Sequence, residues 1–141
     1  VAFGVAPGSY HVAVQHRDHI GIMSASVLAL GATAGNMDFT STATATYGTD
    51  AQRTVGGVRT LWPGDCNGNG TVQYTGSGND RDPVLTRVGA AVPTATLVGY
   101  WSEDVNLDGS VLYTGNGNDR DPILLTIGGS VPTNTRIGQL P

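Results

Sequence analysis

The sequence predicts a mainly β chain with short helices, in which a strand-rich segment precedes two copies of a loop-and-helix module. Composition is the first observation: 21 glycines and only 13% charged residues are typical of strands and turns. Short apolar runs separated by turn residues in residues 1–60 are the second. The third is that residues 61–141 repeat themselves at a constant offset. Together these observations predict two domains of different character.

Residues 1–60 are predicted to be strands followed by a connector. Residues 10–15 alternate between apolar and polar side chains, as a half-exposed strand does. Extended runs are expected at residues 20–30 and again at 37–40. The hydroxyl-rich residues 40–46 are also expected to be extended, as an edge strand or linker, with an O-glycosylated surface strip as the alternative. Val55-Gly56-Gly57-Val58 is typical of a hairpin turn.

The turn Pro7-Gly8-Ser9-Tyr10 before a strand resembles the end of transthyretin-like or carboxypeptidase-regulatory-like β-sandwich domains. Such sandwiches have about seven strands, more than residues 1–60 can supply. The resemblance therefore implies a partial β-sandwich segment, whose missing strands lie upstream or come from another chain. An open sheet edge favours pairing with a further strand.

Residues 61–100 and 101–141 are two copies of one module. Asp65 corresponds to Asp104 (104 − 65 = 39), and the same offset carries residues 79–83 onto 118–122. Each copy contains D-x-[DN]-x-[DN]-G, the opening of an EF-hand calcium loop. Side-chain oxygens at alternate positions can converge on one hard cation, and the glycine allows the sharp turn. The sequence predicts one Ca²⁺ in each module, two per chain.

Each loop also has a hydrophobic residue at its eighth position, Val72 and Val111. This pattern resembles the dockerin family, whose members carry two calcium-binding F-hand repeats, each a loop with one helix. The resemblance covers residues 61–141 and implies the C-terminal part of a large secreted bacterial surface protein. By this resemblance the first site takes Asp65, Asn67, Asn69 and the carbonyl of Thr71. The second takes Asp104, Asn106, Asp108 and the carbonyl of Ser110.

The two loops depart from that pattern at the twelfth position, where a glycine replaces the bidentate acid. An inserted Tyr-Thr-Gly segment moves the acids further along the chain. We expect Asp82 and Asp121 to close the sites, because each precedes a proline in the first turn of a helix. Asp80 and Asp119 are the alternatives, or act as helix caps.

Short helices are predicted at residues 83–88 and 122–127, each followed by a glycine. Two helical turns are not stable on propensity alone, so metal binding and packing must hold them. We therefore expect removal of calcium to loosen or unfold both modules. Residues 92–94 and 131–133 are expected to be extended.

Cys66 is the only cysteine, which excludes an internal disulfide. We interpret it as a small space-filling residue, with a reactive or intermolecular thiol as the alternative. Trp62 and Trp101 precede the two loops and are expected to cover a small core. Stacking on carbohydrate is the alternative use of these rings.

Three histidines, His11, His16 and His19, lie close together in the sequence. In a continuous strand His11 and His19 would share one face and His16 the other, so no common metal site is expected. No nucleophile-and-base spacing and no phosphate-binding loop followed by a lysine occurs. The sequence predicts no enzymatic activity.

The net charge of −4 argues against nucleic acid as a partner, and two Ca²⁺ ions would formally cancel it. No apolar run reaches the ~20 residues that span a bilayer. The chain starts without a methionine or a signal peptide, as a mature or excised piece of a longer protein does. Calcium sites of modest affinity fill where calcium is plentiful, which favours an extracellular or cell-surface location.

These observations lead to three functional hypotheses. The first is an extracellular, calcium-stabilised structural or assembly module, the subunit of a surface filament or array, whose partners are copies of itself or other surface proteins. The second is a dockerin that docks onto a cohesin partner. The third is a carbohydrate-binding module that recognises glycans through its aromatic residues.

Overall fold

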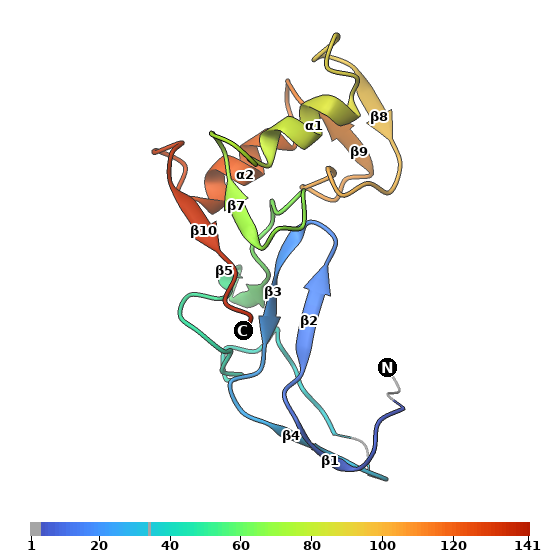
Figure 1. Ribbon diagram of the computed structural model, residues 1–141, viewed down its shortest axis with the longest axis vertical. Coiled ribbons are helices and arrows are strands. Elements are labelled where there is room, and N and C mark those ends of the chain that lie inside the picture. The colour runs from blue at the N-terminus through green and yellow to red at the C-terminus, as the bar shows by residue number, and fades with distance from the viewer. Residues whose placement is uncertain (1–3, 34) are drawn as a thin grey trace. The chain divides into compact units, whose positions relative to one another are not determined.

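The computed structural model describes residues 4–33 and 35–141, and the chain is mainly β with two short helices (Figure 1). The chain divides into two compact units. The first contains residues up to Val14 together with Gly21–Leu61 and Gln139–Pro141. The second contains Gln15–Ile20 and Trp62–Gly138. A short piece of the N-terminal segment therefore belongs with the repeated modules.

The strands of the first 60 residues form separate antiparallel pairs. β1 (Gly8–Tyr10) pairs with β4 (Leu28–Leu30), and β5 (Arg53–Val55) pairs with β6 (Val58–Thr60). β2 (Ala13–His16) and β3 (His19–Met23) form a hairpin. Every sheet in the described part of the chain has only two strands, and none of them forms a sandwich.

Two of the predicted extended stretches form no strand. Residues 37–40 form no strand, because the Asp38 carboxylate accepts hydrogen bonds from the backbone N–H (2.9 Å) and the hydroxyl (2.6 Å) of Thr40. Residues 41–44 are bends and turns for a similar reason, because the hydroxyl groups of Ser41 and Thr44 bond to nearby backbone groups. Thr46 forms an isolated bridge with Ser24. Bends also interrupt the run at residues 20–30 after Met23.

The hairpin turn predicted at residues 55–58 is confirmed. Val55 lies opposite Val58 in the ladder, and the turn residues Gly56 and Gly57 have φ of 57° and 84°. Both values lie in the left-handed region, which only glycine enters freely, so the pair of glycines permits a two-residue turn.

The second unit contains two copies of a strand, a helix and a strand. The first copy is β7 (Thr71–Gln73), α1 (Arg81–Arg87) and β8 (Thr96–Val98). The second copy is β9 (Ser110–Leu112), α2 (Arg120–Thr126) and β10 (Thr135–Ile137). All six bounds of the first copy recur in the second at the 39-residue offset.

The two copies exchange strands. β10 of the second copy pairs with β7 of the first, and β8 of the first pairs with β9 of the second (Figure 1). Each two-stranded sheet therefore contains one strand from each repeat. The two repeats meet at residue 100 in the sequence. In the fold, however, neither repeat forms a sheet from its own strands alone.

The core of this unit repeats in the same way. Cys66, Val72, Val84 and Val88 are buried, and so are the residues 39 positions later: Val105, Val111, Ile123 and Ile127. Ile20 from β3 joins them in one cluster. A small apolar core does therefore exist, and it is built from matched positions of the two repeats.

Both helices begin two residues earlier than predicted, at Arg81 and Arg120. The prolines lie inside the first turn, where a missing N–H costs no helical hydrogen bond. The side-chain oxygen of Asn79 accepts from the backbone N–H of Asp82 at 3.0 Å and starts the first helix, as Asn118 does for the second. Asp80 and Asp119, the alternative cap residues, do occupy the N-cap positions, but their side chains make no capping hydrogen bond. The asparagine one residue earlier makes that bond in each helix.

Each helix ends as predicted at a glycine with positive φ, 94° at Gly89 and 109° at Gly128. The predicted extended residues after them are turns instead. The N–H of Ala95 bonds to the carbonyl of Val92 at 2.9 Å, and Asn134 bonds to Val131 at 3.0 Å. The proline between them fixes φ near the value that the second residue of a turn requires.

Candidate metal centres

The first loop folds around the carboxylate of Asp65. Its two oxygens accept the backbone N–H groups of Asn69 (3.0 Å) and Gly70 (2.9 Å). The side-chain oxygen of Asn67 accepts from the N–H of Asn69 (3.0 Å), and that of Asn69 accepts from Thr71 (2.8 Å). Gly70 has φ of 78°, which permits the sharp turn at the sixth position. The oxygen donors predicted from the sequence therefore lie around one short loop.

The second loop repeats this arrangement contact by contact. Asp104 accepts from the N–H groups of Asp108 and Gly109, both at 3.1 Å. Asn106 accepts from Asp108 at 2.8 Å, and Asp108 accepts from Ser110 at 2.9 Å. Equal geometry at equivalent positions indicates that both loops perform the same task.

Of the rival acids, Asp80 and Asp119 lie inside the loops. Asp80 is fully buried, and its carboxylate accepts the N–H groups of Asn67 (3.4 Å) and Gln73 (2.8 Å). Asp119 is also fully buried and accepts from Val105, Asn106 and Leu112 at 2.7–3.2 Å. Each of these carboxylates joins the start of its loop to the strand that follows.

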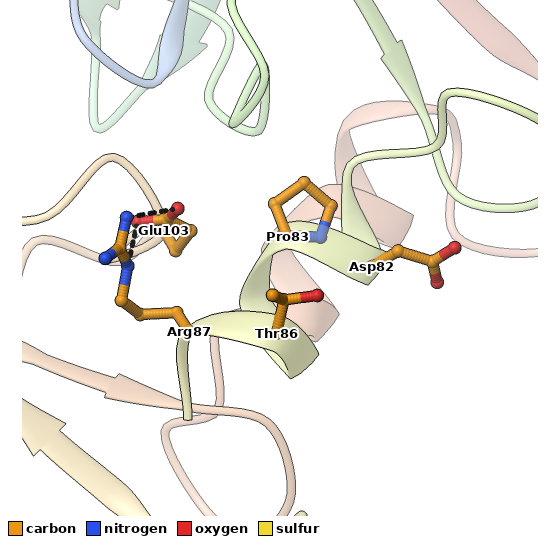
Figure 2. Close-up of a pocket in the computed structure, with 5 residues that line it drawn as sticks. All are labelled: Asp82, Pro83, Thr86, Arg87 and Glu103. Atoms are coloured by element: carbon orange, nitrogen blue, oxygen red, sulfur yellow. Dashed lines mark hydrogen bonds and ion pairs between the residues drawn. The ribbon is translucent and has the colours of Figure 1, made fainter. Parts of the chain in front are cut away.

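Asp82 and Asp121, which we expected to close the sites, lie at the surface. Their side chains are 61% and 60% exposed. The amide of Asn79 donates to Asp82 at 2.8 Å, and an Arg81 nitrogen lies 3.6 Å from it. Figure 2 shows Asp82 at the edge of a pocket that also contains Pro83, Thr86, Arg87 and Glu103. The geometry favours Asp80 and Asp119 as the acids of the loops.

Asp80 and Asp119 are each buried near a second carboxylate, which raises the free energy of their ionised forms. Desolvation, with a contribution from the charge of Asp65, raises the pKa of Asp80 to about 7. The pKa of Asp119 is raised to about 6 by desolvation, with Asp104 contributing. Desolvation also raises the pKa of Asp65. A cation between the paired carboxylates would remove this cost, and the donors available are all oxygens, the ligands that Ca²⁺ prefers.

Cys66 belongs to the apolar core, and the two tryptophans pack against it. Cys66 is buried, like the equivalent Val105, and burial raises the pKa of its thiol well above the ordinary value. Trp62 and Trp101 both pack against the core cluster, as predicted. The guanidinium of Arg136 lies 3.5 Å from the ring centre of Trp62, and that of Arg87 lies 4.4 Å from that of Trp101. Arginine therefore occupies a position that a stacked sugar would need.

The turn of the β2–β3 hairpin contains a group that could hold a metal ion, and the sequence analysis did not predict it. His16, Asp18 and His19 each present one ligand atom, and these atoms lie within 4.8 Å of one another. We expected His16 and His19 on opposite faces of one continuous strand. This was wrong, because residues 17 and 18 form the turn of a hairpin. His16 and His19 are therefore cross-strand neighbours, whose side chains share a face. His11 does not belong to the group, and its ring nitrogen bonds to the carbonyl of Ser24 at 2.8 Å.

The same turn is attached to both modules. The carbonyl of Asp18 accepts the N–H groups of Gly64 (2.7 Å) and Asp65 (3.1 Å) at the start of the first loop. Arg17 donates to the carbonyl of Trp101 at 2.7 Å and lies 3.6 Å from the carboxylate of Asp104. Residues 16–19 are thus part of the framework that positions both loops.

Comparisons with known protein families, with curated proteins and with solved structures found no match. No helix in the described ranges is long and apolar enough to cross a membrane.

Proposed function

We propose that the chain is an extracellular structural or assembly module that two Ca²⁺ ions stabilise. The observation that carries the proposal is the pair of loops with the same hydrogen-bonded arrangement. In each loop, the first aspartate accepts the N–H groups of the fifth and sixth positions. This arrangement places alternate side-chain oxygens around a turn of the size that calcium loops use.

In this proposal the first ion is held by Asp65, Asn67, Asn69, the carbonyl of Thr71 and Asp80. The second ion is held by Asp104, Asn106, Asp108, the carbonyl of Ser110 and Asp119. The first ion would neutralise two carboxylates, Asp65 and Asp80. The second would neutralise three, because the fifth position of its loop is Asp108 where the first loop has Asn69. In both sites one acid starts the loop and another lies directly before the helix. Because those two acids bracket the inserted Tyr-Thr-Gly segment, metal binding would fix the whole module.

The N-terminal unit supports an assembly role. Its sheets have two strands each among the described residues. The second edges of β3 and β6 make only isolated backbone bonds, such as those from Tyr47 to the carbonyl of Met23 (2.8 Å) and from Arg59 to that of Thr40 (2.9 Å). Several valines are about half exposed: Val5, Val27, Val55 and Val58. Open edges and exposed β-branched side chains favour the addition of further strands. We infer that strands from upstream or from another copy complete a β-sandwich here, which would join copies into a filament or array.

Mass and particle shape, measured with calcium and after chelation, test this proposal. We expect two Ca²⁺ per chain by elemental analysis, and particles larger than one chain that depend on protein concentration. Fewer than two ions per chain would overturn the calcium sites. A concentration-independent monomer with two bound ions would overturn the assembly role alone.

Docking onto a cohesin-like partner is a second candidate. The exposed face of α2 presents Leu125, which is 66% exposed, and the equivalent residue of α1, Thr86, is exposed beside the pocket of Figure 2. An exposed apolar side chain on a helix next to the loop offers a contact for a protein partner. A pull-down with cohesin domains, with Leu125→Asp as the control variant, distinguishes docking from self-assembly.

A further inference from the structure

We propose that His16, Asp18 and His19 bind a divalent transition metal of the zinc class, separate from the two calcium ions. Nδ1 of His16 lies 2.5 Å from Oδ1 of Asp18, and Nδ1 of His19 lies 2.6 Å from the same oxygen. The two Nδ1 atoms are 3.1 Å apart. Three potential ligand atoms therefore form one small triangle.

The triangle has nearly the size that a tetrahedral ion needs. With metal–ligand distances of about 2.0–2.1 Å, two ligands of such an ion lie about 3.3 Å apart. The nitrogen–nitrogen distance already matches within a few tenths of an ångström. Both nitrogen–oxygen distances would have to lengthen by less than about 1 Å, which small rotations of the two imidazole rings can supply.

The environment of Asp18 is a second, independent indication. Its side chain is completely buried, yet Oδ2 has no hydrogen-bond partner among the described residues. Buried polar atoms without a partner are rare in proteins, and a bound ion is one of the accepted explanations. The carboxylate has spare acceptor capacity and lies where two imidazoles converge.

The donor set selects the class of metal. Two imidazoles and one carboxylate suit zinc and similar ions, whereas Ca²⁺ requires more ligands, all of them oxygen. The side chain of His16 is 35% exposed, so solvent can reach the site and supply the fourth ligand as water. The ion would lock the hairpin turn that carries the contacts to both calcium loops.

Metal binding must also displace one contact. Nη1 of Arg17 lies 3.3 Å from Nε2 of His16. When Nδ1 binds a metal, the ring proton resides on Nε2, and the guanidinium can no longer donate to it. Arg17 would then keep its bond to the carbonyl of Trp101 and move away from the imidazole.

Zinc titration of the whole chain in saturating Ca²⁺ tests the proposal, because calcium occupies the all-oxygen loops. We expect one Zn²⁺ per chain, and with Co²⁺ the strong visible absorption of a four-coordinate ion. His16→Ala and His19→Ala should each weaken zinc binding by at least about 10–100-fold, the cost of losing even an outer-shell partner. His11→Ala is the matched control and should bind zinc like the unmodified chain.

Calcium titration of the same variants shows whether they are folded. His16→Ala is the safer variant, because its ring is the more exposed of the two. Unchanged zinc affinity in folded His16→Ala would overturn the proposal. So would the absence of binding in the unmodified chain, or a six-coordinate cobalt spectrum that persists when both histidines are replaced.

Discussion

Asp80 and Asp82 are two residues apart in the sequence but have opposite environments. Asp80 is fully buried and accepts backbone N–H groups from both ends of the first loop. Asp82 is 61% exposed and bonds to Asn79 and Arg81. The local sequence cannot separate the two, because each is an acid near the start of a helix. Burial separates them, and burial depends on the tertiary fold.

Asp80→Asn should weaken calcium binding at the first loop by at least about tenfold, since ligand charge sets the affinity of such sites. The control Asp82→Asn should leave the affinity within about twofold, because an exposed charge nearby is screened. Isothermal titration with Ca²⁺ measures both. If Asp80 had only a structural role, Asp80→Asn would destabilise the chain equally with and without calcium.

Cys66 reports on the state of the first module. The thiol is buried and its pKa is raised by desolvation and by the neighbouring carboxylates, of which Asp80 contributes most. Since the thiolate is the reactive form, we expect no reaction with a thiol reagent while calcium is bound. Chelation should raise the labelling rate at least about tenfold, toward the rate in denaturant. Equal rates with and without calcium would contradict the link between the metal and this core.

At the scale of elements, the exchange of strands between the repeats decides which segments depend on one another. β7 follows the first calcium loop directly, and its ladder partner is β10, the last strand of the second repeat. The backbone contact continues beyond the ladder, because Gly138 donates to the carbonyl of Gly70 at 2.7 Å. The first loop therefore depends on a residue 68 positions away in the chain (138 − 70 = 68).

A chain that ends at Asn134 lacks β10 and should lose calcium affinity first at the first loop. The second loop should change less, because β9 retains its partner β8. Labelling of Cys66 and calcium titration follow the two effects, and a chain that ends at Gly138 is the control, since it keeps β10. Unchanged labelling of Cys66 in the shorter chain would contradict the dependence.

The helices show how much of an element the sequence can define. Each has seven residues, too few for a stable isolated helix. Their ends follow from local chemistry: an asparagine side chain accepts an N–H of the first turn, and a glycine with positive φ ends each helix. Their stability follows from packing, since Val84 and Ile123 are fully buried in the shared core.

At the scale of the whole molecule, two ions should supply a large part of the stability of the second unit. Its core cluster is small and made mostly of valines and isoleucines. Ligand at about 100 times its dissociation constant adds about 2.7 kcal/mol per site, so two sites add about 5 kcal/mol. That amount is comparable to the total stability of an ordinary domain.

Thermal unfolding in excess Ca²⁺ and in excess chelator should therefore differ by more than about 10 °C. Mg²⁺ at the same concentration should have a smaller effect, because it demands octahedral geometry. The double variant Asp65→Asn/Asp104→Asn is the control and should unfold at one temperature in both conditions. Equal unfolding temperatures for the unmodified chain would show that its apolar core is sufficient without metal.

The sequence alone determined the features that depend on local chemistry and on repetition. It predicted the mainly β composition, the duplicated module, the hairpin at residues 55–58 and the glycines that end both helices. All of these follow from backbone preferences or from spacing, which the amino-acid order contains directly. Spacing also identified the oxygen-bearing residues of the two loops, which are the donors of the proposed calcium sites.

Only the tertiary structure decided which residues meet across the chain. It paired β7 with β10, buried Asp80 instead of Asp82, and brought His16 and His19 together on Asp18. It also showed turns where hydroxyl-rich residues suggested strands, and two-stranded pairs in place of a sandwich. The physical reason is the same throughout: burial, strand partners and side-chain convergence depend on contacts between distant residues, for which a single sequence carries no local signal.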